Sequence, residues 1–184
     1  MRNQLLVTAF GEDRPGIVAR LSEVFASHGG NLEASRMSLL GGEFAAISLV
    51  TVADEKLAAL EKALADLAKD GLTVACKRTR SLPLDGKTHK FYDIHLTGAD
   101  QEGIVHRVSS YLSGAKVNIH NVQTDIINAP VTGLPLFTMH AEIAVPESLS
   151  YEKLSQDLSH IADELNVEID LVSSTTLHAE LVEA

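Results

Sequence analysis

The sequence has few of the residues that mark a secreted, redox-active or membrane-spanning protein. Its 184 residues include one cysteine (Cys76), no tryptophan, three tyrosines and five phenylalanines. A lone cysteine permits no intrachain disulfide and is typical of a reducing cytosol. No apolar run is long enough to span a bilayer, and the N-terminal residues lack signal-peptide architecture. These absences predict a cytoplasmic protein with no membrane partner, in which Cys76 is a buried structural thiol.

Positive charge is also scarce in this chain. The chain has 15 lysines and arginines and 25 aspartates and glutamates, which gives a formal net charge of −10. A protein that holds nucleic acid unaided needs a basic surface, because contacts with phosphates supply most of the affinity. The densest basic run, from Lys77 to Arg80, covers only four residues. The charge therefore argues against direct nucleic-acid binding.

The chain contains an internal repeat. Residues 10–32 align without a gap with residues 97–119, at an offset of 87, and eight of these 23 positions are identical. The identical pairs are Gly11/Gly98, Asp13/Asp100, Gly16/Gly103, Ile17/Ile104, Val18/Val105, Arg20/Arg107, Ser22/Ser109 and Asn31/Asn118. A period of this length corresponds to a small domain. We predict domains at 1–80 and 90–174, a linker at 81–89 and a tail at 175–184.

Both repeats show the same order of elements. In the first repeat, the apolar pattern predicts strands at 4–10, 31–40, 43–52 and 72–79, and helices at 15–28 and 54–70. In the second, it predicts strands at 90–97, 117–127, 134–145 and 167–172, and helices at 102–113 and 151–165. Right-handed crossovers then predict an α+β fold of two tandem ferredoxin-like βαββαβ domains. Each would be a four-stranded antiparallel sheet with two helices on one face.

The loop before the first helix of each repeat has the chemistry of a carboxylate site. Gly16 and Gly103 leave backbone N–H groups approachable at the helix start. A helix N-terminus carries unpaired donors and positive partial charge, which suit the carboxylate of an amino acid. Asp13 and Asp100 could hold the ammonium group of such a ligand or could cap the helix.

Two further pairs of identical residues have less specific roles. Asn31 and Asn118 begin the next strand, where they could contact a ligand or make a turn hydrogen bond. Arg20 and Arg107 lie one turn into the helix, where we expect them to be solvated.

The first repeat resembles an ACT domain. The resemblance is carried by Gly11-Glu12-Asp13-Arg14-Pro15-Gly16-Ile17-Val18 and by Gly29-Gly30-Asn31-Leu32. ACT domains are small regulatory modules that bind amino acids and related effectors. The second repeat has Gln101-Glu102 in place of Arg-Pro but keeps the flanking aspartate, glycine and asparagine. Two ACT-like units joined by a short linker make the chain similar to the glycine cleavage system transcriptional repressor group.

This resemblance implies a non-catalytic regulatory protein without a cofactor. Such a protein binds a small amino-acid effector, glycine or similar, and controls transcription through a regulatory protein partner. The implied ligand-binding residues are Asp13, Arg14, Pro15, Gly16, Ile17 and Asn31 in the first repeat, and Asp100, Gln101, Gly103, Ile104 and Asn118 in the second.

An enzyme, or the regulatory subunit of an amino-acid metabolic enzyme, is the alternative. The two repeats occupy nearly the whole chain, and no nucleophile-elbow, P-loop or dinucleotide motif is present. Catalysis could reside only where strand alternation places Asp93, His95, His140 and Glu142 on one helix-free sheet face. That group could hold a metal ion for a metal-dependent enzyme, or could be a polar face wetted by solvent.

The helix-free face of the first repeat predicts self-association. The equivalent positions there include Leu6, Phe10, Ile47 and Leu49, so this sheet is apolar on both sides. An uncovered apolar face calls for a partner. We therefore predict a homodimer or larger homo-oligomer with the first repeats at or near the interface.

Overall fold

The computed structural model describes residues 2–80, 89–129 and 133–174, and it divides the chain into two compact units. The first unit is Met1–Leu82 and the second is Pro83–Ala184. Apart from His89, the predicted linker lies outside the described residues, as does the predicted tail. No helix within the described ranges is long and apolar enough to cross a membrane.

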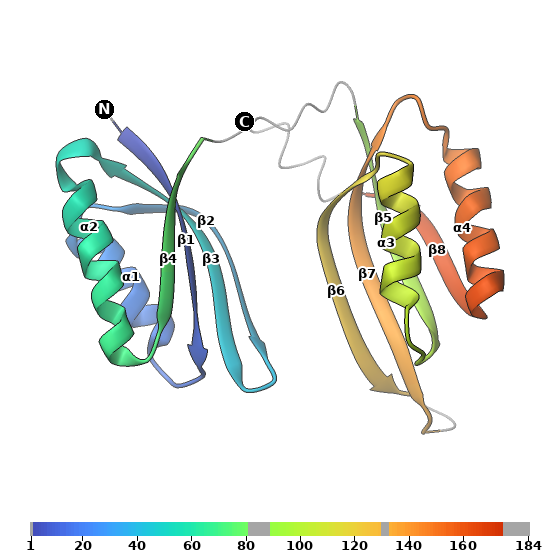
Figure 1. Cartoon of the computed structure of the whole chain (residues 1–184), viewed down its shortest axis with the longest axis horizontal. Coiled ribbons are helices and arrows are strands. Elements are labelled where there is room, and N and C mark those ends of the chain that lie inside the picture. Colours follow the sequence, from blue (N-terminus) through green and yellow to red (C-terminus); the bar gives the residue numbers. More distant parts are fainter. Residues whose placement is uncertain (1, 81–88, 130–132, 175–184) are drawn as a thin grey trace. The chain divides into compact units, whose positions relative to one another are not determined.

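The first unit is a βαββαβ sandwich of one sheet and two helices. Its elements are β1 (Arg2–Glu12), α1 (Ile17–Ser27), β2 (Asn31–Leu40), β3 (Glu43–Ala53), α2 (Asp54–Asp66), the short 3₁₀ helix η1 (Leu67–Asp70) and β4 (Thr73–Thr79). The strands are antiparallel in the order β2-β3-β1-β4. Both helices lie on one face of this sheet (Figure 1).

The second unit repeats this architecture. Its elements are β5 (His89–Ala99), α3 (Ile104–Gly114), β6 (Asn118–Asn128), β7 (Pro135–Pro146), α4 (Tyr151–Leu165) and β8 (Val167–Ser173). The strand order is β6-β7-β5-β8, again antiparallel, with α3 and α4 on one face (Figure 1). The predicted ferredoxin-like fold of both repeats is confirmed.

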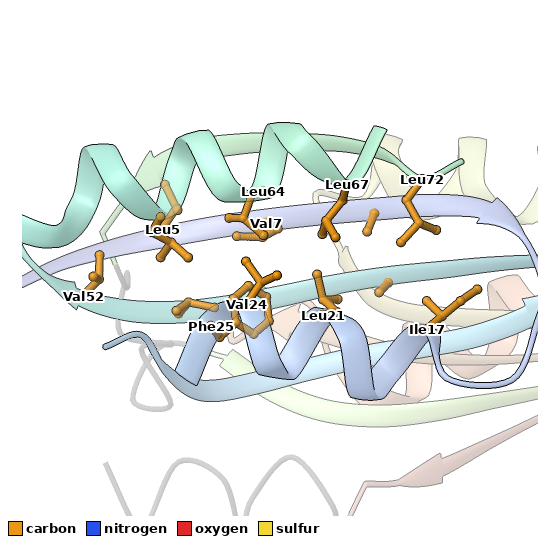
Figure 2. Close-up of a cluster of buried hydrophobic side chains, with 14 of the residues drawn as sticks. Leu5, Val7, Ile17, Leu21, Val24, Phe25, Val52, Leu64, Leu67 and Leu72 are labelled. Atoms are coloured by element: carbon orange, nitrogen blue, oxygen red, sulfur yellow. The ribbon is translucent and has the colours of Figure 1, made fainter. Parts of the chain in front are cut away.

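The core of the first unit lies between the sheet and the two helices, and it is formed by alternate residues of the strands and by one face of each helix. Alternate residues of β1 point to opposite faces, so Leu5, Val7 and Ala9 are buried under the helices. Helix α1 contributes Ile17, Leu21, Val24 and Phe25. Helix α2 contributes Leu57, Leu60 and Leu64, and η1 contributes Leu67. Figure 2 shows Leu5, Leu21 and Leu64 among the side chains of this cluster that meet between the sheet and the two helices. The second unit has its own equivalent cluster.

The prediction that Cys76 is buried is wrong. The residue is exposed on β4, because β4 is an edge strand that pairs only with β1 in its sheet. Partial desolvation and the nearby Glu61 carboxylate raise the pKa of the Cys76 thiol above its usual value. A raised pKa favours the protonated thiol, which is the unreactive form.

Candidate functional site

The loop between β1 and α1 ends in a glycine with left-handed backbone geometry. Gly16 has φ 98°, and α1 begins only at Ile17, so the prediction that Pro15 lies in the first helical turn is wrong. A residue in this conformation cannot continue a right-handed helix, so the helix starts after it. Gly103 has φ 90° at the equivalent point, and α3 begins at Ile104. The identical glycines are therefore required by the backbone itself.

Both helices begin without a side-chain cap. Within the described part of the chain, no side chain hydrogen-bonds to the first turn of α1 or α3, and neither first turn contains an acidic residue. The capping role considered for Asp13 and Asp100 is therefore wrong. In α1, the Arg20 N–H donates to the Gly16 carbonyl at 2.9 Å. The backbone N–H groups of the helical residues before Arg20 therefore have no acceptor within the helix. This end of α1 retains its positive partial charge.

A hollow opens beside this end of α1. It has a volume of about 270 Å³ and is lined by Arg14, Pro15, Gly16, Ile17, Arg20, Asp70 and Leu72. A second hollow, of about 350 Å³, shares Arg14 and Asp70 with the first and also includes Glu12, Asp13 and Gly71. The structure thus gathers the five predicted loop residues of the first repeat, Asp13 to Ile17, around two neighbouring hollows.

Charged side chains of both signs line the first hollow. The Arg14 guanidinium donates to the backbone carbonyl of Asp70. The Nε atom of Arg20 lies 3.4 Å from the Asp70 carboxylate, and its Nη1 atom lies 3.0 Å from that of Glu23. Hydrogen bonds to Glu23 and then Asp70 raise the pKa of Arg20. Arg20 is exposed but ion-paired, so the expectation that it is simply solvated was incomplete.

The second unit keeps this link between its loop and its second helix. The Gln101 side chain donates to the Leu165 carbonyl at the end of α4, where the first unit uses Arg14. Arg107 contacts the Glu164 carboxylate through Nη2 at 2.7 Å and Nε at 3.0 Å. Asp70 and Glu164 were absent from the predicted site. The identical arginines 20 and 107 were the signal that could have pointed to them.

The two units differ in what lies beside the loop. A hollow of about 490 Å³ in the second unit is lined by Thr97, Gly98, Leu136, Ala162, Asp163, Asn166, Val167 and Glu168. None of the predicted ligand-binding residues of the second repeat (Asp100, Gln101, Gly103, Ile104 and Asn118) lines it. The geometry around the first loop is therefore the better match to the predicted site.

The asparagines lie far from the glycine loops. Asn31 pairs with Thr51 in the sheet, beside the beginning of β1, whereas Gly16 follows the end of β1. Helix α1, with 11 residues, separates Gly16 from Asn31 by roughly 16 Å along its axis. Asn118 occupies the equivalent place in the second unit, opposite Ala144. Within one unit, the structure does not bring the asparagine and the loop together.

Gly11 and Gly98 are identical for a steric reason. A Cβ atom on Gly11 would lie 2.6 Å from the Gly71 carbonyl oxygen, and one on Gly98 would lie 2.4 Å from a Val167 methyl group. The turn before β4 in the first unit, and the first residue of β8 in the second, therefore approach the central strand closely at this point. These glycines support the loop but need no ligand to explain them.

The Gly11→Ala variant is expected to lower the free energy of unfolding by about 1–3 kcal/mol, because the backbone must shift to admit the methyl group. Gly114→Ala is the matched control, since nothing lies within 4 Å of a Cβ atom there and its φ is not in the left-handed region. Denaturant titration measures both. Equal stability of Gly11→Ala and the parent would contradict the close approach.

The polar group on the second sheet has the predicted placement. Asp93 pairs with Glu142 and His95 with His140, so all four residues share the helix-free face. The imidazoles of His95 and His140 stack with centroids 4.6 Å apart, and the His140 Nε2 atom lies 3.5 Å from Asp93. Across the described residues, no group of three or more histidine, cysteine or acidic side chains has metal-binding geometry.

The fold and the loop geometry define a class of protein. Residues 3–77 match the family model of the ACT domain. The second unit has the same topology and the same uncapped, glycine-initiated helix. The first unit is therefore an ACT domain, and the second unit has the same ACT-type fold.

Among its relatives are glycine cleavage repressors. The chain is 26% identical over 170 residues to the glycine cleavage system transcriptional repressor of Escherichia coli strain K12, covering 91% of this chain and 88% of the relative. A protein of unknown function from Galdieria sulphuraria has a crystal structure with TM-score 0.80 and 32% identity, covering 95% of this chain and 100% of that one. A crystal structure assigned to a glycine cleavage system transcriptional repressor has TM-score 0.69 and 20% identity, covering 95% and 99%, which shows the shared fold.

Proposed function

We propose that this chain is a non-catalytic regulatory protein that binds a small amino acid, glycine or similar. The carboxylate of the ligand lies at the N-terminus of α1, in the hollow bounded by Arg14, Gly16 and Arg20. Asp13 and Asp70 offer carboxylates to the ammonium group. The observation that carries the proposal is the uncapped start of α1 beside a hollow lined by charges of both signs.

We further propose that control of transcription is indirect and runs through a protein partner. The relatives named as transcriptional repressors support the link to transcription. The net charge of −10 opposes direct contact with DNA, because DNA phosphates would be repelled by most of this surface.

The helix-free face of the first unit, which includes Leu6, Phe10, Ile47 and Leu49, is the surface through which we expect copies of the chain to associate.

Glycine binding is expected to depend on Arg20. Isothermal titration calorimetry should detect glycine at up to millimolar concentration, and Arg20→Gln should weaken binding about tenfold or more. The reason is that a hydrogen bond to a charged group contributes about 1.5–3 kcal/mol. Arg107→Gln is the matched control, because that arginine occupies the same position in the second unit. The absence of binding by the parent to glycine, alanine or serine would remove the main support for the proposal.

Duplex DNA is expected not to bind the purified protein at physiological salt. A basic footprint is needed for phosphate contacts, and this chain has an excess of ten negative charges. Fluorescence anisotropy with labelled duplex, recorded over a series of salt concentrations, measures this. Binding that weakens as salt is added would overturn the indirect mode.

A further inference from the structure

Basic side chains gather at the end of the first unit remote from the Gly16 loop. They surround a hollow of about 740 Å³ whose lining residues are Arg2, Asn3, Gln4, Thr51, Asp54, Arg78, Thr79 and Arg80. Three of these eight residues are arginines, and one, Asp54, is acidic. The lining residues by themselves carry three positive charges and one negative charge, in a chain whose net charge is −10.

A row of polar side chains crosses three strands at this hollow. Gln4 of β1 pairs with Thr51 of β3 on one side and with Thr79 of β4 on the other, so all three lie on the helix-free face. Thr51 is only 8% exposed, and in the described part of the chain its Oγ1 atom has no hydrogen-bond partner. A buried hydroxyl without a partner is destabilising, so the sheet keeps this polar position at a cost in stability.

The acidic groups near the hollow leave two of its arginines without a counter-charge. The Asp54 carboxylate accepts a hydrogen bond from the Asn3 side chain at 2.8 Å. Glu61 lies 3.8 Å from Arg78, and the Glu33 carboxylate accepts a hydrogen bond from the Gln4 side chain at 3.3 Å. Within residues 2–80, 89–129 and 133–174, no carboxylate forms an ion pair with Arg2 or Arg80.

We propose that this hollow is an anion site for a small phosphate-bearing ligand, a phosphomonoester or a diphosphate. Guanidinium groups present parallel N–H donors that match phosphate oxygens, and such charge-assisted pairs are stronger than neutral hydrogen bonds. Arg2 and Arg80 hold the phosphate charge, and the Thr79 side chain, which also lines the hollow, adds a polar contact. The site shares no residue with the amino-acid site proposed above, so the chain has places for two chemically different ligands.

Titration with inorganic pyrophosphate at constant ionic strength tests the proposal. Calorimetry on the full chain should give saturable binding at millimolar concentration or below. The Arg2→Gln/Arg80→Gln variant should bind roughly tenfold more weakly or worse, since each lost contact to a charged group is worth more than about 1.4 kcal/mol. The Arg36→Gln/Lys69→Gln variant is the matched control, because it loses the same net charge outside the hollow. Circular dichroism verifies that both variants are folded.

Each outcome decides the question. Weakening in the first variant alone supports the site. No saturable binding by the parent, or equal weakening in both variants, overturns it, because general charge would then account for the effect. Should Arg2→Gln/Arg80→Gln not fold, amide chemical-shift changes in the parent decide, with shifts at Thr51 and Thr79 supporting the site and shifts elsewhere overturning it. Unchanged glycine binding in the folded variant separates this site from the amino-acid site.

Discussion

Replacement of Leu64 by alanine is expected to lower the free energy of unfolding of the first unit by about 2–5 kcal/mol. Leu64 is fully buried and lies between α2 and the sheet in Figure 2. Truncation removes the transfer free energy of its side chain and leaves a cavity that the close-packed neighbours cannot fill. The first unit has its own core, so the loss should stay within that unit.

The tyrosines of this chain make that measurement selective. Tyr92, Tyr111 and Tyr151, which are all the tyrosines in the sequence, belong to the second unit, and the chain has no tryptophan. In a urea titration, Leu64→Ala should shift the circular dichroism transition to lower denaturant and leave the tyrosine fluorescence transition in place. Leu158→Ala, buried in the second core, should shift the fluorescence transition instead. Leu40→Ala, at an exposed position, should change stability by less than about 0.5 kcal/mol. A fluorescence shift in Leu64→Ala would contradict independent cores.

Aspartate at both Phe10 and Ile47 is expected to convert the proposed oligomer to monomers. These side chains are 55% and 43% exposed in the single chain and lie on the helix-free face of the first sheet. Covering apolar side chains of this size contributes on the order of 1.5–3 kcal/mol each. Replacing both by charges should therefore weaken association by about a hundredfold or more. Sedimentation velocity over a range of protein concentrations measures the change.

The control for this pair is Val105→Asp/Val172→Asp in the second unit. Both valines are similarly exposed, at 43% and 50%, but lie outside the first sheet. The control should sediment as the parent does, and all variants should keep the parent circular dichroism spectrum because the substituted residues lie outside the cores. A parent chain that is monomeric at tens of micromolar would contradict the oligomer.

The internal repeat and the apolar periodicities predicted the fold. The offset of 87 residues aligned strands and helices that occupy the same positions in the topology of the two units. Strand alternation placed Asp93 and His95 beside Glu142 and His140. Such predictions succeed because side-chain direction in strands and helices is set by local geometry. The start of α1 was predicted less well, because Pro15 suggested a first helical turn from residue 15, whereas the left-handed conformation of Gly16 delays the helix to Ile17.

The sequence by itself determined the fold class, the duplication and the acidic charge, together with the loop that begins at Gly11. These properties depend on local pattern and composition. Only the tertiary structure decided that Asp70 and Glu164 contact the arginines of the first helices, because those residues are about fifty positions apart in the chain. It also decided that Asn31 lies at the other end of its unit from Gly16, and that Arg2 and Arg80 line one hollow. Contacts of this kind arise from the packing of helices and the pairing of strands that are distant in the sequence, which no local periodicity encodes.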